Sequence, residues 1–485
     1  MESTKPFPIG LTFDDVLLVP QRFSGGSRSE ITVHSRFSRT IELEIPVVSS
    51  NMDTVTEAGM AIAMARSGGI GVIHRFLPTE VQVREIEKVK RAQNFIIEEP
   101  YTLRPTDTLA IAQSLMKTKE VSGLLVTDEN NHLVGILTRR DLRFLHNNHQ
   151  DPVSEFMTPK DAMVVASPDI TMADAKEMLR KHRVEKLPLV TTSGLLSGLI
   201  TSVDIERSED SPIATKDERG RLRVAAAIGV KGDAIPRSTA LLKAGVDALV
   251  VDIAHGHSDL AIDTVRKLRS EFGDEIQVVA GNVATREGTE DLIAAGADSI
   301  KVGVGPGSIC VTRVVTGSGM PQLTAVLESA SVAKEHGVPV IADGGIRTSG
   351  DVCKAIAAGA STVMLGNLLA GTTESPGFPI IRNGRKVKVI RGMAGLGAAL
   401  GRESKKGAFD DDFSNFADFV PEGVEAVVPY RGSVSEVIGQ LIGGLRSGIS
   451  YCGSSSIPEM QDKSRFIRIT NSGVVESKSH DVAQV

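Results

Sequence analysis

The sequence predicts a (β/α)8 TIM barrel that is interrupted once by an inserted domain. Eight short apolar runs end in Gly, Asn, Asp or His, helix-like stretches closed by a glycine lie between many of them, and one gap between runs is far longer than the others. The first two features are typical of parallel β/α units. A doubly wound open sheet is the alternative that the same pattern allows.

The eight runs are the expected strands, in chain order. Segments such as "LIAAGADSIKV" and "AIAAGASTVML" pass from a helical pattern through a glycine turn into the next run. In a TIM barrel, the residues that follow the strand ends build the active site. The runs are "PVVSSNMD" (46–53), "GIGVIH" (69–74), "VAAAIG" (224–229), "LVVDIAHG" (249–256), "VVAGNV" (278–283), "SIKVGVG" (299–305), "PVIADGG" (339–345) and "TVMLGN" (362–367), and they end on one rim with Asn51, Asp53, His74, Asp252, His255, Asn282, Asp343 and Asn367.

The insertion lies between the second and third runs, which about 150 residues separate. Within it, "LVGILTRRDL" (133–142) recurs 63 residues later as "LSGLITSVDI" (196–205). Each copy reads as a helix, a strand, a turn and a strand that ends in Thr-x-x-Asp. We therefore expect a first barrel segment at 1–93, an inserted repeat domain at 94–208, and a second barrel segment at 209–485.

The repeated Thr-x-x-Asp endings allow two interpretations. A threonine and an aspartate at a strand end often cap the next helix, so the repeat can be a structural duplication without a ligand. Alternatively, Thr138, Asp141, Thr201 and Asp204 hold ribose or phosphate groups between the two halves. The repeat resembles the paired cystathionine-β-synthase (CBS) modules, and this resemblance implies an adenine or guanine nucleotide as a regulatory ligand.

Composition limits the partners. The net charge of -6 gives no electrostatic reason to expect nucleic acid, although a small anionic ligand remains compatible with local sites. No apolar run approaches the roughly 20 residues that a membrane span needs. The N-terminus lacks the apolar core of a signal peptide. We expect a cytoplasmic protein without a membrane partner.

The glycine-rich turn "GVGPGSIC" follows the sixth run. Its backbone N–H groups and the Ser308 hydroxyl are suited to a phosphate, although an ordinary tight turn has the same composition. The next two runs end in "ADGGI" and "LGNLL", which add donors near Gly345, Gly366 and Asn367. Three turns that converge on one phosphate are typical of the barrel, and they place Asp343 for ribose hydroxyls or for helix capping.

The three cysteines are too few and too scattered for a disulfide framework or a clustered zinc site. Cys310 lies in the glycine-rich turn, where exposure and nearby phosphate-binding amides favour a reactive thiolate. Cys353 lies in the helical run "DVCKAIAAG" and is expected to fill space, whereas Cys452 lies in a Gly/Ser turn with no evident partner.

Six motifs together resemble the inosine-monophosphate dehydrogenase and guanosine-monophosphate reductase family. The similarity spans nearly the whole chain, with the repeat insertion where that family carries it. The motifs are "LTFDDVLLVP", "NMDTVTEAGMAIAMARSGGIGVIH", "VVDIAHGHS", "GPGSICVTR", "IADGGI" and "VPEGVE".

The resemblance implies a role for each site residue. Cys310 would attack C2 of a purine nucleoside monophosphate, with Thr312 and Glu422 as a proton-transfer pair. Asp343 would hold the ribose. The 5′-phosphate would be bound by Ser308, Gly345 and Gly366, the base would be contacted by Met393 and Glu422, and the nicotinamide side would be formed by Asp252 and its neighbour His255, with which we group Asn282.

A monovalent cation, K+, is implied as well. Its ligands would be the main-chain carbonyls of Gly305, Gly307 and Cys310, completed in relatives by the C-terminal segment of a neighbouring subunit, here "ESKSHDV" (476–482). The resemblance also implies a fourfold assembly of barrels, as a homotetramer or an octamer.

The family catalyses two reactions through one covalent cysteine–purine intermediate. The dehydrogenase passes hydride from C2 to NAD+ and then hydrolyses the intermediate, whereas the reductase expels ammonia from GMP and accepts hydride from NADPH. Thr312 and Glu422 match the reductase pair, but dehydrogenases carry the same residue types there, so these two residues do not separate the reactions.

The flap before "VPEGVE" separates them better, because dehydrogenase hydrolysis depends on an Arg-Tyr pair with the arginine as general base. Here Ala408 and Phe409 occupy the expected positions, and neither can take a proton from water. We therefore predict a GMP reductase with NADPH. IMP dehydrogenase with NAD+ and an atypical flap is the first alternative, and an inactive nucleotide-sensing protein is the second.

Overall fold

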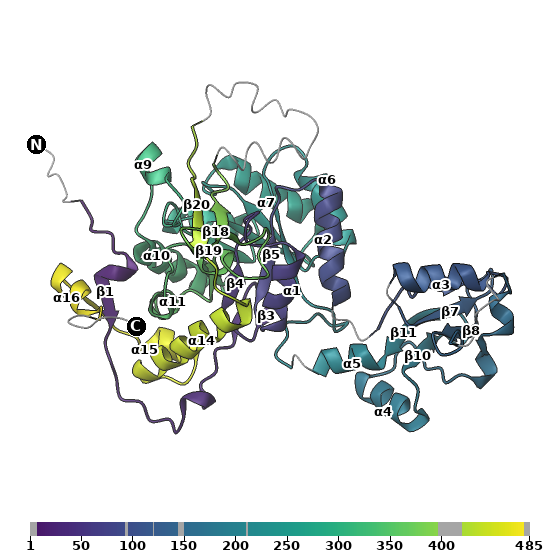
Figure 1. Cartoon of the computed structure of the whole chain (residues 1–485). Helices are drawn as coiled ribbons and strands as arrows, with labels where there is room; N and C mark the ends of the chain where they lie inside the picture. The colour runs from purple at the N-terminus through teal and green to yellow at the C-terminus, as the bar shows by residue number, and fades with distance from the viewer. Residues whose placement is uncertain are drawn as a thin grey trace, which may run out of the picture. The chain divides into compact units, whose positions relative to one another are not determined.

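The computed structural model describes residues 7–92, 96–119, 121–143, 150–209, 212–395 and 420–479. The chain divides into two compact units. The barrel unit comprises Met1–Ala92, Ile213–Asp217 and Leu222–Val485, and the inserted unit comprises Gln93–Pro212 and Glu218–Arg221. Figure 1 shows the helices of the barrel unit wrapped around its central strands.

The barrel unit contains a closed, eight-stranded parallel barrel, which confirms the predicted TIM barrel and removes the open-sheet alternative. β5 pairs with β4 on one side and with β12 on the other, so the described strands form a complete ring. The ring runs β12 (Ala225–Ile228), β13 (Ala248–Asp252), β14 (Gln277–Val283), β15 (Ser299–Val302), β16 (Val340–Asp343), β17 (Thr362–Leu365), β4 (Val47–Ser49) and β5 (Ile70–Ile73).

Side chains fill the barrel interior, as barrels of eight strands require. Val48, Val72, Ala225, Val250 and Met364 belong to one fully buried cluster to which alternate strand residues contribute. The opposite faces of the strands pack against the surrounding helices in a second, larger cluster. The interior is therefore a packed core, and any ligand site must lie at an end of the barrel.

Polar caps and glycine turns bound several of the helices around the barrel. Thr285 caps α8 and Thr348 caps α11 through their side chains, and Gly296 and Gly359 turn the chain into the next strand with φ of +107° each. The helices are α1 (Ala58–Arg66), α2 (Thr79–Ala92), α6 (Ala234–Lys243), α7 (Asp259–Phe272), α8 (Arg286–Ala294), α10 (Gln322–Glu335), α11 (Ser349–Ala357) and α14 (Val434–Tyr451).

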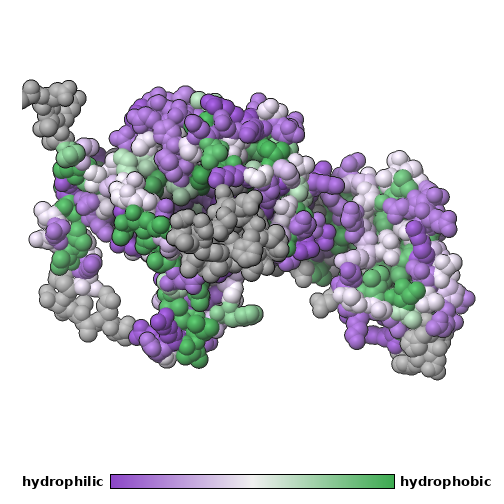
Figure 2. All heavy atoms as spheres, turned by 90° about the horizontal axis from the view of Figure 1, so that it is seen from above, coloured by the Kyte–Doolittle hydropathy of each residue, from purple (hydrophilic) through white to green (hydrophobic). Residues whose placement is uncertain are grey.

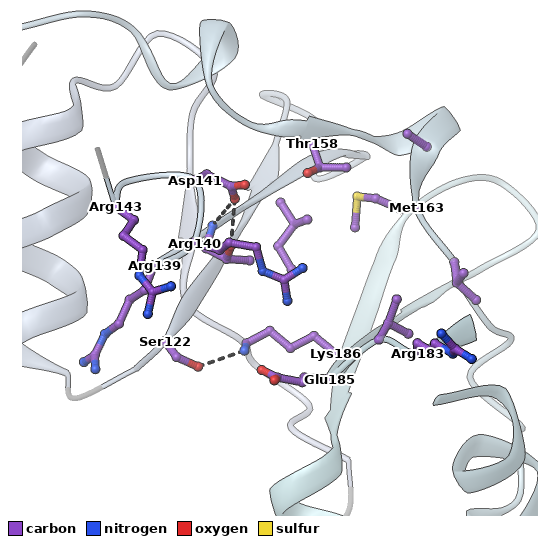
Figure 3. Close-up of a pocket in the computed structure, with 15 residues that line it drawn as sticks. Ser122, Arg139, Arg140, Asp141, Arg143, Thr158, Met163, Arg183, Glu185 and Lys186 are labelled. Carbon is purple, nitrogen blue, oxygen red and sulfur yellow. Dashed lines mark hydrogen bonds between the residues drawn. The ribbon is translucent and has the colours of Figure 1, made fainter. Parts of the chain in front are cut away.

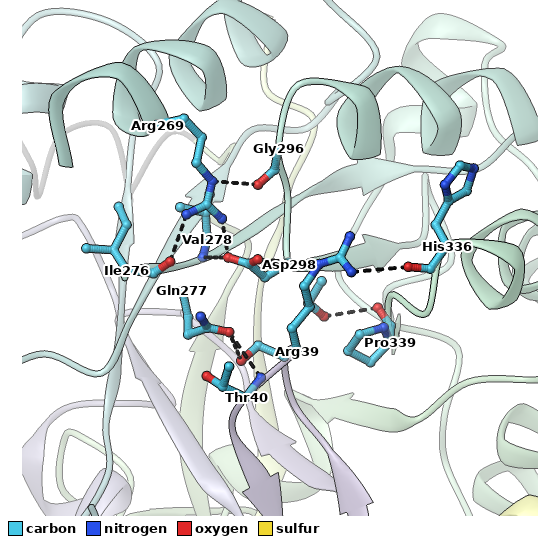
Figure 4. Close-up of polar contacts among 12 residues, drawn as sticks. Arg39, Thr40, Arg269, Ile276, Gln277, Val278, Gly296, Asp298, His336 and Pro339 are labelled. Atoms are coloured by element: carbon cyan, nitrogen blue, oxygen red, sulfur yellow. Dashed lines mark hydrogen bonds and ion pairs between the residues drawn. The ribbon is translucent and has the colours of Figure 1, made fainter. Parts of the chain in front are cut away.

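A hairpin of β2 (Ser35–Arg36) and β3 (Glu42–Leu43) closes the end of the barrel at which the strands begin. Its side chains Phe37, Ile41 and Leu43 are fully buried in the cluster that fills the barrel. The Ser38 hydroxyl donates to Gln277 Oε1, at the first residue of β14, over 2.8 Å. Figure 4 shows this polar floor around Arg39, Gln277 and Asp298. The sequence pattern did not predict this hairpin.

The opposite end of the barrel carries the site. There β18 (Ile380–Arg382), β19 (Arg385–Arg391) and β20 (Glu425–Pro429) form an antiparallel sheet. Two short helices, α9 (Thr312–Thr316) and α12 (Asn367–Ala370), follow β15 and β17. The chain ends form β1 (Val16–Leu18), β21 (Phe466–Arg468), α15 (Ile457–Lys463), α16 (Asn471–Glu476) and the 3-10 helices η1 (Phe13–Asp15) and η2 (Arg28–Glu30), with β1 and β21 paired.

The inserted unit has two similar halves. The predicted order of helix, strand, turn and strand is present in both, as α3 (Leu109–Thr118), β7 (Gly123–Thr127) and β8 (Leu133–Thr138), and as α4 (Met172–His182), β10 (Lys186–Val190) and β11 (Leu196–Thr201). β6 (Thr102–Leu103) and β9 (Thr158–Pro159) extend the first sheet, η3 (Val153–Glu155) and η4 (Lys160–Ala162) connect the halves, and α5 (Ser202–Glu209) ends the unit.

The two hairpins of the inserted unit meet at their turns. Leu196 N donates to Asn131 O over 2.9 Å, and Leu133 N donates to Gly194 O over 3.3 Å. Leu125, Leu133 and Leu199 share a small buried cluster between the halves. The repeat is thus a packed pair of modules, each with its own apolar core.

No helix among the described residues is both long enough and apolar enough to cross a bilayer. Figure 2 shows one face of the molecule, on which hydrophobic residues form several patches separated by hydrophilic ones.

Candidate active site

Cys310 lies in the turn between β15 and α9. Gly303 and Gly305 hold φ of +150° and +82°, conformations that favour glycine, and the chain closes back where Cys310 N donates to Gly307 O over 3.2 Å. The thiol is free and partly exposed. The expectation that the glycine-rich turn presents this cysteine at the rim agrees with its position.

A short backbone pairing brings a distant segment to this turn. Val311 N donates to Glu422 O over 2.8 Å, and Val424 N donates to Ile309 O over 3.0 Å, so that Cys310 and Gly423 lie opposite each other. On the far side, Gly392 N donates to Val424 O over 2.9 Å. A Cβ on Gly423 would lie only 3.0 Å from Gly392 Cα, so only glycine allows these backbones to approach so closely.

This pairing aligns three side chains into a chain of hydrogen bonds. The Cys310 thiol donates to Thr312 Oγ1 over 3.1 Å, and the Thr312 hydroxyl donates to Glu422 Oε2 over 2.7 Å. A thiol, a hydroxyl and a carboxylate in sequence can move a proton between the sulfur and the carboxylate. The three residues that we predict to be catalytic are therefore in contact.

A cavity of about 420 Å³ opens beside the thiol. Cys310, Thr312 and Met393 line one part of it, and Asp252, Asn282 and Asp343 line another. Gly305 and Gly307 form part of its wall. The cavity thus joins the residues that we assign to the base, the ribose and the nicotinamide side.

The residues that we assign to the phosphate lie just outside this lining. The Asn367 side chain donates to Ser308 Oγ over 3.2 Å. A Cβ on Gly366 would lie 3.3 Å from Ser50 Oγ, and a Cβ on Gly345 would lie 3.5 Å from Pro306, and both of these neighbours line the cavity. The three turns therefore do converge next to the cavity.

Lys301 lies in the lining of the cavity and connects two of its carboxylates. Its side chain is 2% exposed, and Nζ lies 2.9 Å from Asp252 Oδ1 and 3.1 Å from Asp343 Oδ2. It also donates to Asn282 Oδ1. Burial alone would lower the pKa of Lys301, but Asp252 and Asp343 outweigh it and raise that pKa above its ordinary value.

Asp252 responds in the opposite direction. Burial alone would raise its pKa, but Lys301 and then Arg75 outweigh burial and hold the pKa below its ordinary value. An Asn51 side chain also hydrogen-bonds to this carboxylate. Asp252 is therefore a carboxylate under ordinary conditions and can accept hydrogen bonds from a ligand.

An ion pair between buried Asp53 and partly exposed Arg391 holds the segment that carries Met393. Arg391 Nε donates to Asp53 Oδ2 over 2.7 Å, and Asp53 N lies 3.4 Å from the Met393 sulfur. Asp53 is buried and follows β4, whereas Arg391 ends β19. The pair fixes where Met393 enters the cavity.

Some of the predicted rim residues lie apart from the cavity. His255 is exposed and does not contribute to the lining, and its ring centroid lies 6.4 Å from that of His257. His74 is fully buried beside Glu57, with its Nε2 3.4 Å from Glu57 Oε1.

Cys353 and Cys452 are buried, and burial raises the pKa of Cys353 to about 12.

The carbonyls that we assign to a monovalent cation belong to the same turn as the thiol. Gly307 O accepts the Cys310 N–H, so a cation there would share this oxygen with the turn. Arg313 packs against Gly305 and Gly319, where a Cβ on either glycine would lie 2.6 Å from Arg313 Cγ. Carbonyl oxygens in a tight turn fit a hard cation.

The inserted unit holds a cavity of its own, of about 370 Å³. Figure 3 shows Arg139, Arg140 and Arg143 on one side of it and Arg183 and Lys186 on the other. Asp141 and Glu185 are the acidic residues in its lining. The excess of cationic side chains suits an anionic ligand.

The repeated Thr-x-x-Asp endings form the same local contact in both halves. Thr138 Oγ1 donates to Asp141 Oδ2 over 2.8 Å, and Thr201 Oγ1 donates to Asp204 Oδ2 over 2.6 Å. Thr138 and Asp141 line the cavity, whereas Thr201 and Asp204 do not. The contacts are those of the capping interpretation, and ligand binding by these residues stays a prediction.

Sequence reasoning missed several cavity residues. Ser50, Arg75 and Lys301 line the cavity, but we assigned a role to none of them. A lysine inside the apolar run "SIKVGVG" was the available signal for Lys301, because a charge in a buried strand needs partners. Ala408, Phe409 and the end of the "ESKSHDV" segment (480–482) lie outside the described residues.

Comparisons with known proteins show similarity along nearly the whole chain. Residues 10–480 match the family described as "IMP dehydrogenase / GMP reductase domain". An inosine-5′-monophosphate dehydrogenase of Nitrosopumilus maritimus (strain SCM1) is 53% identical over 479 residues, which cover 98% of this chain and 99% of the relative. A GMP reductase of Leishmania major is 51% identical over 491 residues, which cover 100% and 99%.

A solved structure is also similar along its whole length. A cysteine-to-alanine variant of the GMP reductase from Trypanosoma brucei, in complex with guanosine 5′-monophosphate, superposes with a TM-score of 0.91. It is 48% identical, and the match covers 99% of each chain.

Proposed function

The chain belongs to the IMP dehydrogenase / GMP reductase family of NAD(P)-dependent purine nucleotide oxidoreductases, and from this premise we propose that it is a GMP reductase. It converts GMP and NADPH into IMP, ammonia and NADP+. A purine nucleoside monophosphate is its substrate, and Cys310 is its nucleophile.

One contrast carries this proposal. The Cys310–Thr312–Glu422 hydrogen-bond chain is complete, whereas Ala408 and Phe409 stand where water activation by the dehydrogenase would need Arg-Tyr. A protein that can deliver a proton but lacks the general base for hydrolysis is suited to expel an amine. The similarity to a reductase crystallised with GMP supports the same direction.

The residues then divide the work as follows. The Cys310 sulfur attacks C2 of GMP, and Thr312 and Glu422 deliver a proton to the departing 2-amino group. Asp343 accepts hydrogen bonds from the ribose, and Met393 contacts the base. Ser308, Gly345, Gly366 and Asn367 bind the 5′-phosphate through the turns that converge beside the cavity.

Asp252 and Asn282 face the nicotinamide side. Their oxygens and the Asn282 amide can pair with a carboxamide, and they line the same cavity as Cys310, so the residues present fit the cofactor. NADPH, when bound, supplies the hydride that C2 accepts. His255 is exposed, so we retain it only as a contact to a more distant part of the cofactor.

We also propose a monovalent cation, K+, on the carbonyls of Gly305, Gly307 and Cys310, completed by the 476–482 segment of a neighbouring subunit in a homotetramer or octamer. Three free thiols suit a reducing compartment such as the cytoplasm.

We propose that the inserted domain, which the sequence predicts at residues 94–208, is a pair of CBS modules that binds an adenine or guanine nucleotide. The cationic cavity around Arg140 and Lys186 supports an anionic effector, and Thr138 and Asp141 also line it. Thr201 and Asp204, which lie outside this lining, are proposed as ribose or phosphate contacts by analogy with the first half of the repeat. A Trypanosoma brucei GMP reductase has been solved with guanosine 5′-triphosphate, which supports the nucleotide class.

Calorimetric titration of ATP and GTP into the full chain tests this regulatory site. We expect heat from at least one nucleotide, and we expect Arg140→Ala to weaken that binding about tenfold. If neither nucleotide releases heat, or if Arg140→Ala binds as the parent does, the cavity is not a nucleotide site.

IMP dehydrogenase remains the alternative, favoured by the 53% identity to a protein of that name. An assay of reduced-nicotinamide absorbance separates the candidates. NADPH consumption that requires GMP supports the reductase, NADH formation from IMP and NAD+ replaces it with the dehydrogenase, and silence in both assays favours a nucleotide-sensing protein without turnover.

A further inference from the structure

A buried lysine without an assigned role joins the two halves of the proposed site. Lys301 lies in the middle of β15, between Ile300 and Val302, which are both fully buried. An ammonium in such a position must be compensated, because burial of an unpaired charge is very costly. Its partners, rather than the strand itself, must therefore explain its presence.

Its partners come from three other strands of the barrel. Asp252 ends β13, Asn282 lies near the end of β14, and Asp343 ends β16. Nζ reaches Asp252 Oδ1 at 2.9 Å and Asp343 Oδ2 at 3.1 Å, and it also donates to Asn282. The Lys301 ammonium thus contacts residues at or near the ends of β14 and β16, which flank β15, and of β13, which lies beyond β14.

The same contacts orient both carboxylates. Asp343 Oδ2 accepts from Lys301 and, over 3.0 Å, from Asn282 Nδ2. The Asn282 amide also donates to Gly303 O over 2.8 Å, which ties the cluster to the turn that carries Cys310. Without the ammonium, the repulsion between the Asp252 and Asp343 carboxylates would lose its main compensating charge, with Arg75 left as the other cation that acts on Asp252.

We propose that Lys301 is a positioning residue that links the nucleotide and cofactor subsites. It holds Asp343 in place for the ribose and Asp252 in place for the nicotinamide side. Because either ligand excludes water from the cluster, it strengthens the attraction of Lys301 for the other carboxylate. Each ligand therefore strengthens the binding of the other. This inference rests on the proposed binding of GMP and NADPH to this cavity.

The test uses the full chain with GMP and NADP+, which cannot react together. Calorimetry gives the Kd of each ligand alone and of each in the presence of the other, and the ratio of the two values is the coupling factor. We expect a coupling factor above about threefold in the parent. Lys301→Met should weaken both ligands by at least about tenfold and bring the coupling factor to one.

Two further variants separate positioning from stability. Lys301→Arg keeps the charge and should restore part of the coupling. Lys388→Met removes an equally buried ammonium, whose Nζ donates to the carbonyls of Thr372 and Ser375 over 3.0 and 2.7 Å, away from the cavity. It should lower Tm and leave both Kd values and the coupling factor unchanged.

The inference is overturned if the parent binds GMP and NADP+ independently, or if Lys301→Met lowers only Tm or only one affinity. These results leave the proposed function intact, because the parent still binds both ligands and turns over. A parent that binds neither ligand contradicts the proposed function itself, and the inference with it.

Discussion

The Thr312 hydroxyl donates to Glu422 Oε2 over 2.7 Å, although 110 residues separate them in the chain. The contact exists because residues 309–311 pair with residues 422–424 through two backbone hydrogen bonds. Glu422 lies in neither a helix nor a barrel strand, and this backbone pairing alone brings its carboxylate to the turn that carries Cys310. Substitutions at this contact should change chemistry more than folding.

Replacement of the nucleophile gives the first prediction. Cys310→Ala removes the sulfur that forms the covalent bond, so turnover of GMP should fall to background while GMP binding stays within about threefold of the parent. Steady-state NADPH consumption and calorimetry measure the two quantities. Measurable turnover by Cys310→Ala would exclude this cysteine from the mechanism.

Neutralisation of the Glu422 carboxylate gives the second prediction. Glu422→Gln keeps a hydrogen bond to Thr312 but cannot take up a proton, so kcat should fall by roughly 100- to 10,000-fold with little change in the Kd of GMP. Glu425→Gln, at an exposed position on β20, is the matched control and should retain kcat. Equal losses in the two variants would mean that Glu422 only supports the sheet.

The barrel was predictable because its eight strands are short apolar runs with polar ends, and glycine turns precede several of them. The floor hairpin was not, since β2 and β3 are two residues each and Phe37 has no periodic neighbours that mark a strand. Their burial inside the barrel depends on closure of the ring, which is a tertiary feature. Short local patterns carry no information about it.

The site was predictable to a similar degree. The position of Asp252, Asn282 and Asp343 at the ends of strands indicated that they belong to the site. The family resemblance added Thr312 and Glu422. His255 fits the same rule, but it is exposed and does not line the cavity. Lys301 was missed because its role depends on partners from three other strands, which no single segment displays.

Burial predicts different reactivities for the three thiols. Burial raises the pKa of Cys353 to about 12, and burial also raises the pKa of Cys452. Cys353 is therefore almost entirely a protonated thiol at pH 8, and the residue is only 5% exposed. Brief treatment with iodoacetamide should therefore modify Cys310 alone, as peptide mass spectrometry can show. Faster labelling of Cys353 or Cys452 would contradict this assignment.

The ion pair between Asp53 and Arg391 should act on substrate binding. Asp53→Asn leaves the Arg391 guanidinium without its carboxylate and loosens Met393, so the KM for GMP should rise about tenfold with a smaller change in kcat. Arg391→Met should have a similar effect, and the double variant should be little worse than either single one. Additive losses would show that the two residues act separately.

The end of the barrel that the β2–β3 hairpin closes gives a prediction in which stability changes and ligand binding does not. Asp298 accepts from Arg269 and from Val278 N, the latter over 2.8 Å, and lies 3.6 Å from Arg39 Nε, all at the end of the barrel away from the cavity (Figure 4). Asp298→Ala leaves two guanidinium groups without this partner, so the free energy of unfolding should fall by about 3 kcal/mol.

In the folded Asp298→Ala protein, the Kd values of GMP and NADP+ should match those of the parent, because conserving the rim is enough to keep the site. Asp263→Ala, which removes an exposed ion pair with Arg266, is the control and should cost less than about 1 kcal/mol. Denaturant titration compares the two variants. A change in ligand affinity without a loss of stability would mean that the floor communicates with the rim, because the two ends of the barrel share only the packed core between them.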